Sequence, residues 1–162
     1  MQNLKSFTIR WDDLDPNRHV ANTTFSVLMN DRRMSFLSEN GFTQDKFDQL
    51  QIGPVILSEH FYYIKEVMPG STVYIDIELL GNTSDGKYIS FCHSLYNANG
   101  KMCAYSTMLF VWMDLKTRKV IVPPDELKQI NNRLVKSDLY KVLNEEDIRP
   151  KIPVRTVDLM QV

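Results

Sequence analysis

The stretch from Arg10 to Phe25, RWDDLDPNRHVANTTF, concentrates side chains that could do chemistry. It holds three aspartates, two arginines, one histidine and two asparagines around a single proline. A carboxylate can act as a general base or as a nucleophile, and an imidazole can transfer a proton or orient a neighbour. The alternative is a solvated turn, because Asp-Pro-Asn is also a common way to connect a strand to a helix.

A strand is predicted before this stretch and a helix after it. Residues 4–11 place alternating apolar side chains, including Trp11, on one face, which is typical of a strand. Apolar residues at helical spacing follow from residue 25 to residue 37. Asn22 is expected to cap this helix through its side-chain oxygen, and Gly41 to end it in the left-handed conformation. We therefore predict a helix of about 18 residues.

Four further strands are predicted in the middle of the chain. They occupy residues 53–67, 71–81, 87–96 and 101–114, and the turn sequences MPGS, NTSDG and NANG separate them. Only one long helix is available to cover the resulting sheet. The sequence therefore predicts an α+β fold, in which a curved antiparallel sheet wraps around one central helix. The sheet edges that remain uncovered favour a homodimer or a dimer of dimers.

The pattern changes near residue 124. Residues 123–134 predict a short helix and residues 137–147 a second one, while the two prolines after residue 148 predict an extended arm. We therefore divide the chain into a domain over residues 1–124 and a helical and extended C-terminal extension over residues 125–162.

Composition excludes several classes of partner. The formal net charge of −1 argues against nucleic acid and against an acidic membrane surface. No apolar run approaches the roughly 20 residues of a membrane span, and the N-terminus lacks the apolar segment of a signal peptide. We therefore expect a cytoplasmic protein. Cys92 and Cys103 are expected to be free thiols, and His60 and His93 lack metal-ligand spacing.

These elements, read together with the stretch from Arg10 to Phe25, resemble the hotdog-fold acyl-CoA thioesterases of the 4-hydroxybenzoyl-CoA thioesterase type. That family carries Asp-x-Asp-x-x-Gly-His-Val-Asn-Asn-x-x-Tyr between the first strand and the central helix, then a helical acidic pair and an arginine. The matching residues are Asp13, Asp15, His19, Val20, Asn22, Phe25 and Arg33. The departures are Arg18 for the glycine, Ala21 for the first asparagine, and Asn30 with Asp31 for the acidic pair. The resemblance covers residues 1 to about 124.

The resemblance implies hydrolysis of an acyl-CoA thioester to a free acid and CoA. Asp15 would act as general base or nucleophile, and His19 would orient this carboxylate or the water. The backbone amide of Asn22, at the positive end of the helix, would bind the oxyanion. One such donor typically lowers the barrier by about 2.7–4 kcal/mol. No metal and no cofactor are expected, because coenzyme A enters as part of the substrate.

Three other residues are candidates for contact with the substrate. Glu59 could enter the site from a neighbouring subunit. Phe25 and Arg33 have a second interpretation each, Phe25 as a core residue and Arg33 as half of an ion pair at a dimer interface. Coenzyme A would also need cations, and the candidates are Lys65, Lys87, Arg118 and Lys119.

Other functions fit the same scaffold. The acyl group could be carried by acyl carrier protein, which changes the partner but not the chemistry. The chain could also bind an acyl thioester without cleaving it. Hotdog dehydratases need a histidine and a carboxylate in a different arrangement, which DPNRHVAN does not supply. Activity towards CoA and carrier-protein thioesters would separate these functions.

Overall fold

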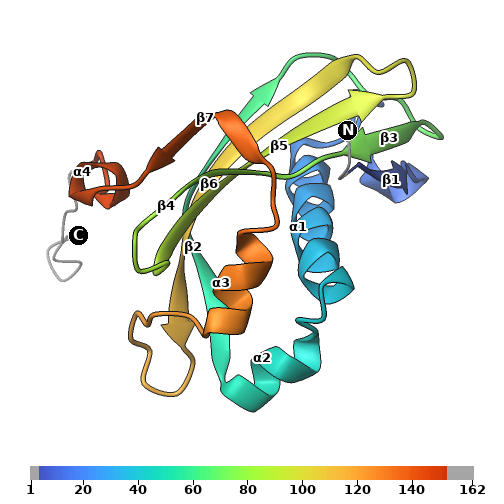
Figure 1. Ribbon diagram of the computed structural model, residues 1–162. Helices are drawn as coiled ribbons and strands as arrows, with labels where there is room; N and C mark the ends of the chain where they lie inside the picture. The colour runs from blue at the N-terminus through green and yellow to red at the C-terminus, as the bar shows by residue number, and fades with distance from the viewer. Residues whose placement is uncertain (1–3, 153–162) are drawn as a thin grey trace, which may run out of the picture.

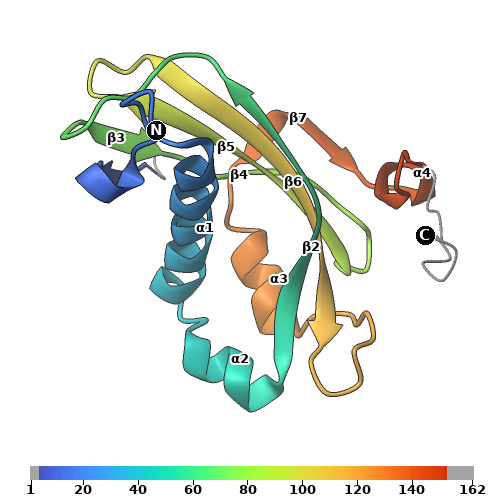
Figure 2. The same cartoon turned by 180° about the vertical axis from the view of Figure 1, so that it is seen from behind.

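The computed structural model describes residues 4–152 as one curved, mostly antiparallel sheet that holds helix α1 in its hollow (Figure 1). Helix α1 runs over Asn22–Glu39, which is the length and position that the sequence predicts. The view from behind shows the helix lying along the concave face of the sheet (Figure 2). The predicted α+β architecture is therefore confirmed.

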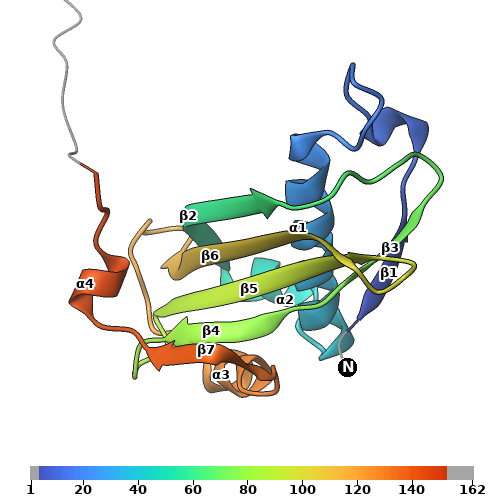
Figure 3. The ribbon, with the colours of Figure 1, turned by 90° about the horizontal axis from the view of Figure 1, so that it is seen from above.

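Seven strands make up the sheet. They are β1 (Lys5–Thr8), β2 (Ile52–Tyr63), β3 (Thr72–Ile75), β4 (Glu78–Asn82), β5 (Tyr88–Asn97), β6 (Met102–Asp114) and β7 (Lys136–Val142). Seen from above, β2, β6, β5, β4 and β7 follow one another across the sheet (Figure 3). β3 and β4 lie end to end beside β5, with β1 next to β3. Within the described residues β2 pairs only with β6, so its other edge is open.

Short helices connect these strands. A 3-10 turn, η1, spans Trp11–Asp13, and the others are α2 (Gln44–Leu50), α3 (Asp125–Asn131) and α4 (Glu145–Ile148). Across residues 4–152, none of the helices combines the length and the apolar character needed to cross a bilayer.

The buried face of α1 packs against two apolar clusters of the sheet. Near the end of the helix, Phe36 packs in a cluster with Trp112 and with Leu127 of α3. Near its start, Phe25 packs in a second cluster with Leu95. Helix α3 thus adds to the same core, although it belongs to the predicted extension over residues 125–162.

A polar layer lies between the two apolar clusters. Arg33 of α1 is 6% exposed, and His93 of β5 is fully buried. The Ser106 hydroxyl donates to the Met29 sulfur at 2.9 Å and lies 3.5 Å from His93 Nδ1. Burial and the neighbouring arginines lower the pKa of His93 well below its usual value, so the ring is neutral in the interior.

The first strand is shorter than predicted. It ends at Thr8, although the Ile9 N–H still donates to the Ser71 carbonyl at 2.9 Å. Trp11 was predicted on the apolar face of a strand over residues 4–11. It lies instead in η1 and is 82% exposed.

The predicted strand over residues 71–81 is broken into β3 and β4. At the break, the Asp76 N–H donates to the Ser94 carbonyl at 3.1 Å, and the Asp76 carboxylate accepts the Ser94 N–H at 2.8 Å. The carboxylate thus takes the place of a backbone carbonyl in the ladder. This side-chain bond is invisible to the alternation of apolar residues along the strand.

The prediction of a second C-terminal helix over residues 137–147 is wrong. The chain forms strand β7, which pairs in parallel with β4, and then the single turn α4. The packing depends on Gly81, because an added Cβ there would lie 2.6 Å from the Lys141 carbonyl oxygen and 2.9 Å from Leu143 Cδ2. The extended arm is predicted from residue 148 onward; Ile148 ends α4, and residues 153–162 lie outside the described residues.

Gly81→Ala is therefore expected to destabilise the fold by about 1–3 kcal/mol, the usual cost of overpacking. The new methyl group would push β7 away from β4. Thermal unfolding, combined with amide hydrogen exchange in residues 136–142, measures both effects. The matched control is Gly53→Ala, where the nearest atom is a movable Leu115 side-chain carbon at 3.2 Å. An equal loss of stability in the two variants would contradict the packing role of Gly81.

Candidate active site

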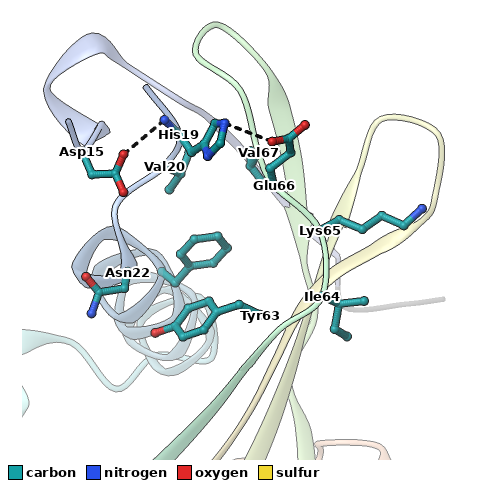
Figure 4. Close-up of a pocket in the computed structure, with 10 residues that line it drawn as sticks. Asp15, His19, Val20, Asn22, Tyr63, Ile64, Lys65, Glu66 and Val67 are labelled. Carbon is teal, nitrogen blue, oxygen red and sulfur yellow. Dashed lines mark hydrogen bonds and ion pairs between the residues drawn. The ribbon is translucent and has the colours of Figure 1, made fainter. Parts of the chain in front are cut away.

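A cavity of about 300 Å³ lies beside the N-terminal end of α1 (Figure 4). One wall comes from the loop and the first turn of the helix, and the other from the end of β2 and the connection to β3. The lining residues are Asp15, His19, Val20, Asn22, Phe25, Tyr63, Ile64, Lys65, Glu66 and Val67. Four of the six predicted site residues, namely Asp15, His19, Asn22 and Phe25, are thus brought together.

The loop that carries Asp15 is a small hairpin closed by backbone hydrogen bonds. Leu14 and Val20 form an antiparallel bridge, and the Asp15 N–H donates to the His19 carbonyl at 2.9 Å. The Val20 N–H donates to the Val67 carbonyl at 3.0 Å, which ties the hairpin to the opposite wall. Both walls of the cavity are therefore held by backbone hydrogen bonds.

The two oxygens of the Asp15 carboxylate have different surroundings. Oδ1 accepts the backbone N–H groups of Asn17 at 2.8 Å and of His19 at 3.3 Å. Oδ2 accepts one long bond, from Asn17 Nδ2 at 3.3 Å. One oxygen thus holds the loop, and the other keeps acceptor capacity for a group in the cavity.

The expectation that Asn22 caps the helix is wrong. Ala21 is the N-cap residue, with extended backbone angles, and Asn22 is the first helical residue. The Asp13 carbonyl fixes this start, because it accepts the Ala21 N–H at 2.9 Å and the Thr24 hydroxyl at 3.0 Å. Figure 4 shows the Asn22 amide pointing away from Tyr63 and Glu66.

This start leaves donors at the cavity. In the part of the chain that the structure describes, no acceptor bonds the backbone N–H of Asn22 or of Thr23. Unpaired N–H groups at the positive end of a helix attract an anion or a polarised carbonyl oxygen. The predicted oxyanion donor is therefore available, although the side chain of Asn22 does not play the predicted capping role.

His19 pairs with a residue that sequence reasoning missed. Its Nε2 lies 3.0 Å from Glu66 Oε2, across the cavity from Asp15 (Figure 4). The His19 ring therefore does not bond the Asp15 carboxylate. Within His19, only the backbone N–H donates to that carboxylate. Glu66 lies on the connection after β2, and no local pattern marks it, because the pair forms only when the hairpin docks against that connection.

Two aromatic residues, Phe25 and Tyr63, line the cavity. Phe25 meets Tyr63 edge to face, with ring centroids 5.3 Å apart, and Tyr63 stacks on Phe61 at 5.9 Å. Phe25 is 4% exposed and also belongs to the apolar core. Phe25 is therefore a core residue that also belongs to the lining of the cavity.

Glu59 and Arg33 lie outside the cavity and face each other. Arg33 Nη1 and Glu59 Oε1 are 3.7 Å apart, an ion pair too long for a hydrogen bond. Burial lowers the pKa of Arg33, and the Glu59 carboxylate opposes this shift. The Ser26 hydroxyl donates to Glu59 at 3.4 Å. Because Glu59 belongs to β2, this pair lies beside the open edge of the sheet.

Of the four cations considered for coenzyme A, Lys65 lines the cavity. Lys87, Arg118 and Lys119 do not. Among residues 4–152, His, Cys, Asp and Glu side chains form no group of three or more that could hold a metal ion.

A curved sheet wrapped around one helix, with a carboxylate loop at the start of that helix, defines a hotdog-fold protein. The family model of the thioesterase-like superfamily matches residues 9–130, and the chain belongs to this superfamily. No curated protein sequence matches the chain.

Solved structures share the fold at low sequence identity. A hypothetical protein from Staphylococcus aureus, solved in complex with CoA, has a TM-score of 0.75 and 15% identity, over 94% of this chain and 95% of that chain. A 1,4-dihydroxy-2-naphthoyl-CoA thioesterase from Synechocystis has a TM-score of 0.73 and 12% identity, over 81% and 96%. A DHNA-CoA thioesterase from Staphylococcus aureus has the same TM-score and identity, over 81% and 89%.

The backbone conformation of Arg18 is one that favours glycine. Its φ is +65°, in the left-handed region that favours glycine, and its N–H closes a turn on the Asp15 carbonyl at 2.9 Å. The glycine in the family pattern is therefore explained by this turn, and Arg18 adopts the same conformation with strain.

Arg18→Gly is expected to stabilise the fold by about 1 kcal/mol. The left-handed conformation costs a non-glycine residue roughly 1–2 kcal/mol, and the backbone entropy of glycine cancels part of the gain. Chemical denaturation measures the change. Arg18→Ala is the control, since alanine keeps the strain and loses the side chain. If both variants gained the same stability, the arginine side chain rather than its φ would be the cause.

Proposed function

We propose that this protein hydrolyses an acyl-CoA thioester to a free acid and CoA in the cavity beside the start of α1. The observation that carries the proposal is that a base or nucleophile and an oxyanion donor occur at the same cavity. Asp15 and Asn22 line the same cavity, and among the described residues no acceptor bonds the backbone N–H of Asn22. Thioester hydrolysis needs a base or nucleophile on one side of the carbonyl and an oxyanion donor on the other.

The reaction begins with the thioester oxygen directed at the N–H groups of Asn22 and Thr23. Asp15 either takes a proton from water, whose oxygen attacks the carbonyl carbon, or attacks that carbon itself. The helix N-terminus stabilises the negative charge that develops on the carbonyl oxygen. The C–S bond then breaks, and CoA leaves as a thiolate that takes up a proton. In the nucleophilic route, water then hydrolyses the acyl anhydride on Asp15.

The other lining residues position the reactants. Glu66 holds the ring of His19 at the edge of the cavity, where it can orient the attacking water. The rings of Phe25 and Tyr63 offer an apolar surface for the acyl group. Lys65 supplies a positive charge for the phosphates of CoA.

The structural neighbours support CoA as the thiol carrier. One neighbour was solved in complex with CoA, and two are CoA thioesterases. Acyl carrier protein remains the alternative carrier, and binding without cleavage is the alternative function. A panel of acyl-CoA and acyl-carrier-protein thioesters, assayed for release of free thiol, separates these outcomes.

Asp15→Asn is expected to lower kcat/KM towards the best acyl-CoA by at least a hundredfold, because the amide cannot act as base or nucleophile. The variant should still fold, since its Oδ1 can accept the N–H groups of Asn17 and His19. Release of thiol, followed with a chromogenic disulfide, gives the rates.

Asp12→Asn is the matched control, an exposed carboxylate of the same loop that pairs with Arg10 and lies outside the cavity lining. Its activity should equal that of the wild type. Full activity of Asp15→Asn would refute the role of Asp15. Tight binding of CoA thioesters by an inert wild type would favour the binding function instead.

We further propose that two copies join along β2. This strand is open over twelve residues and carries exposed apolar side chains, including Ile56 and Leu57 at 48% each. An open apolar edge strand readily pairs with another strand. A two-fold pairing would cover the Arg33–Glu59 ion pair of each copy and bring the second subunit close to the cavity.

Leu57→Glu is expected to convert the dimer to a monomer, because pairing would bring charged side chains of both copies to one apolar seam. Light scattering after size exclusion measures the mass. Leu139→Glu is the control, an exposed leucine (71%) on the other edge strand, β7. A monomeric wild type, or dissociation caused equally by both variants, would count against pairing through β2.

A further inference from the structure

A second and larger cavity, of about 500 Å³, lies at the margin of the outer face of the sheet. β1 runs beside β3 and β7 beside β4 (Figure 3). The residues that line the cavity include Tyr74 of β3, Glu78 of β4 and, at the break between the two strands, Asp76. It shares no residue with the cavity that contains Asp15. Its volume is in the range of small-molecule binding sites.

Aromatic and aliphatic side chains form most of its walls. Tyr74 and Tyr96 face each other across β3 and β5, while Leu4 precedes β1 and Val135 precedes β7. Leu4 is 42% exposed and Val135 is 52% exposed. Such walls accept an apolar chain or ring, and the tyrosine faces also attract a cation.

Two carboxylates, Asp76 and Glu78, lie on the same cavity. Asp76 is engaged by the Ser94 N–H and, at 3.4 Å, by the Tyr96 hydroxyl, and Arg32 of α1 offsets part of its charge. Glu78 interacts with the side chain of Ser137 and with Cys92, whose Sγ lies 3.9 Å from Glu78 Oε2. None of the described residues that line this cavity is a lysine or an arginine.

We propose that this cavity binds a small molecule with a primary ammonium group on an apolar chain or ring. The ammonium group donates hydrogen bonds to Glu78 and to Asp76 Oδ2, the oxygen with the weaker partner. These bonds offset part of the hydration that the two carboxylates lose by burial. The apolar part lies against Tyr74, Leu4 and Val135. Neutral and anionic molecules of the same shape lack the interaction between the ammonium group and the two carboxylates.

Titration of the carboxylates gives the site a pH dependence of known sign. Burial raises the pKa of Glu78 and of Asp76, and the nearby carboxylates of Asp76 and Asp138 raise the pKa of Glu78 further. A cation binds the ionised form, so affinity falls as the pH is lowered through these raised values, and binding releases protons. The titratable and polar groups that face Glu78 or Asp76 are Arg32, Cys92, Ser94, Tyr96, Tyr105, Ser137 and Asp138.

The test uses n-hexylamine as the probe, with 1-hexanol and hexanoate as neutral and anionic analogues of equal length. Titration of the ¹⁵N-labelled protein, followed by amide chemical shifts, gives both the Kd and the location. We expect hexylamine to bind at least tenfold more tightly than either analogue, with shifts at Asn97, Gly100 and Val135. Affinity should decrease from pH 8 to pH 5.

Two variants test the residues. Glu78→Gln should weaken hexylamine at least tenfold, while Asp85→Asn should not, because Asp85 pairs with Lys87 outside the cavity. If Glu78→Gln fails to fold, Val135→Lys serves instead, since the half-exposed position tolerates a lysine whose amine would occupy the site. Val135→Lys should abolish hexylamine binding.

Three results would overturn the proposal. One is equal affinity for hexylamine and hexanol, which would mean a plain apolar groove. Another is a set of shifts confined to the cavity around Asp15 and Glu66, which also holds carboxylates. The third is unchanged hexylamine affinity in a folded Glu78→Gln or Val135→Lys variant. None of these measurements depends on thioesterase activity.

Discussion

The rest of the structure depends on one constraint, the burial of a single helix in the hollow of a single sheet. Helix α1 supplies much of the apolar surface that covers the concave face, with further side chains from α2 and α3, and the sheet curves around it. The wrapping buries polar residues as well, and the side chains of Arg33 and His93 lie in the protein interior. It also fixes the helix axis, so that the free N–H groups of Asn22 and Thr23 point to one end of the molecule.

The sequence predicts those parts of the fold whose signals are local. The bounds of α1 follow from the apolar spacing between Phe25 and Leu37 and from Gly41, which adopts a φ of +88°. The parts that it does not predict depend on contacts between distant residues. Asp76 interrupts a well-alternating strand because its carboxylate bonds the Ser94 backbone. Residues 136–142 become a strand because Gly81 lets β7 approach β4 closely.

The same distinction applies to the candidate site. Asp15, His19, Asn22 and Phe25 occur within one short motif, and a motif can be read from the sequence. Glu66 belongs to no motif, and it reaches His19 only because the Val20 N–H bonds the Val67 carbonyl and brings the two walls together. The start of α1 is anchored by a different residue from the one that the motif suggests. The Asp13 carbonyl, rather than the Asn22 side chain, anchors the first turn, and this leaves the Asn22 N–H free for a ligand.

The two cavities differ in the charges that surround them. At the first, the positive end of α1 and Lys65 balance Asp15 and Glu66, so a group that gains negative charge can be stabilised next to a carboxylate. At the second, Asp76 and Glu78 face an apolar hollow, and the nearest compensating charge, that of Arg32, lies on the helix side of the sheet. The thioester hydrolysis proposed for the first cavity fits this balance of charge, whereas anionic groups such as phosphates and carboxylates are repelled by the second. The two cavities are separate in the fold, because the first lies at the start of α1 and the second on the outer face of the sheet.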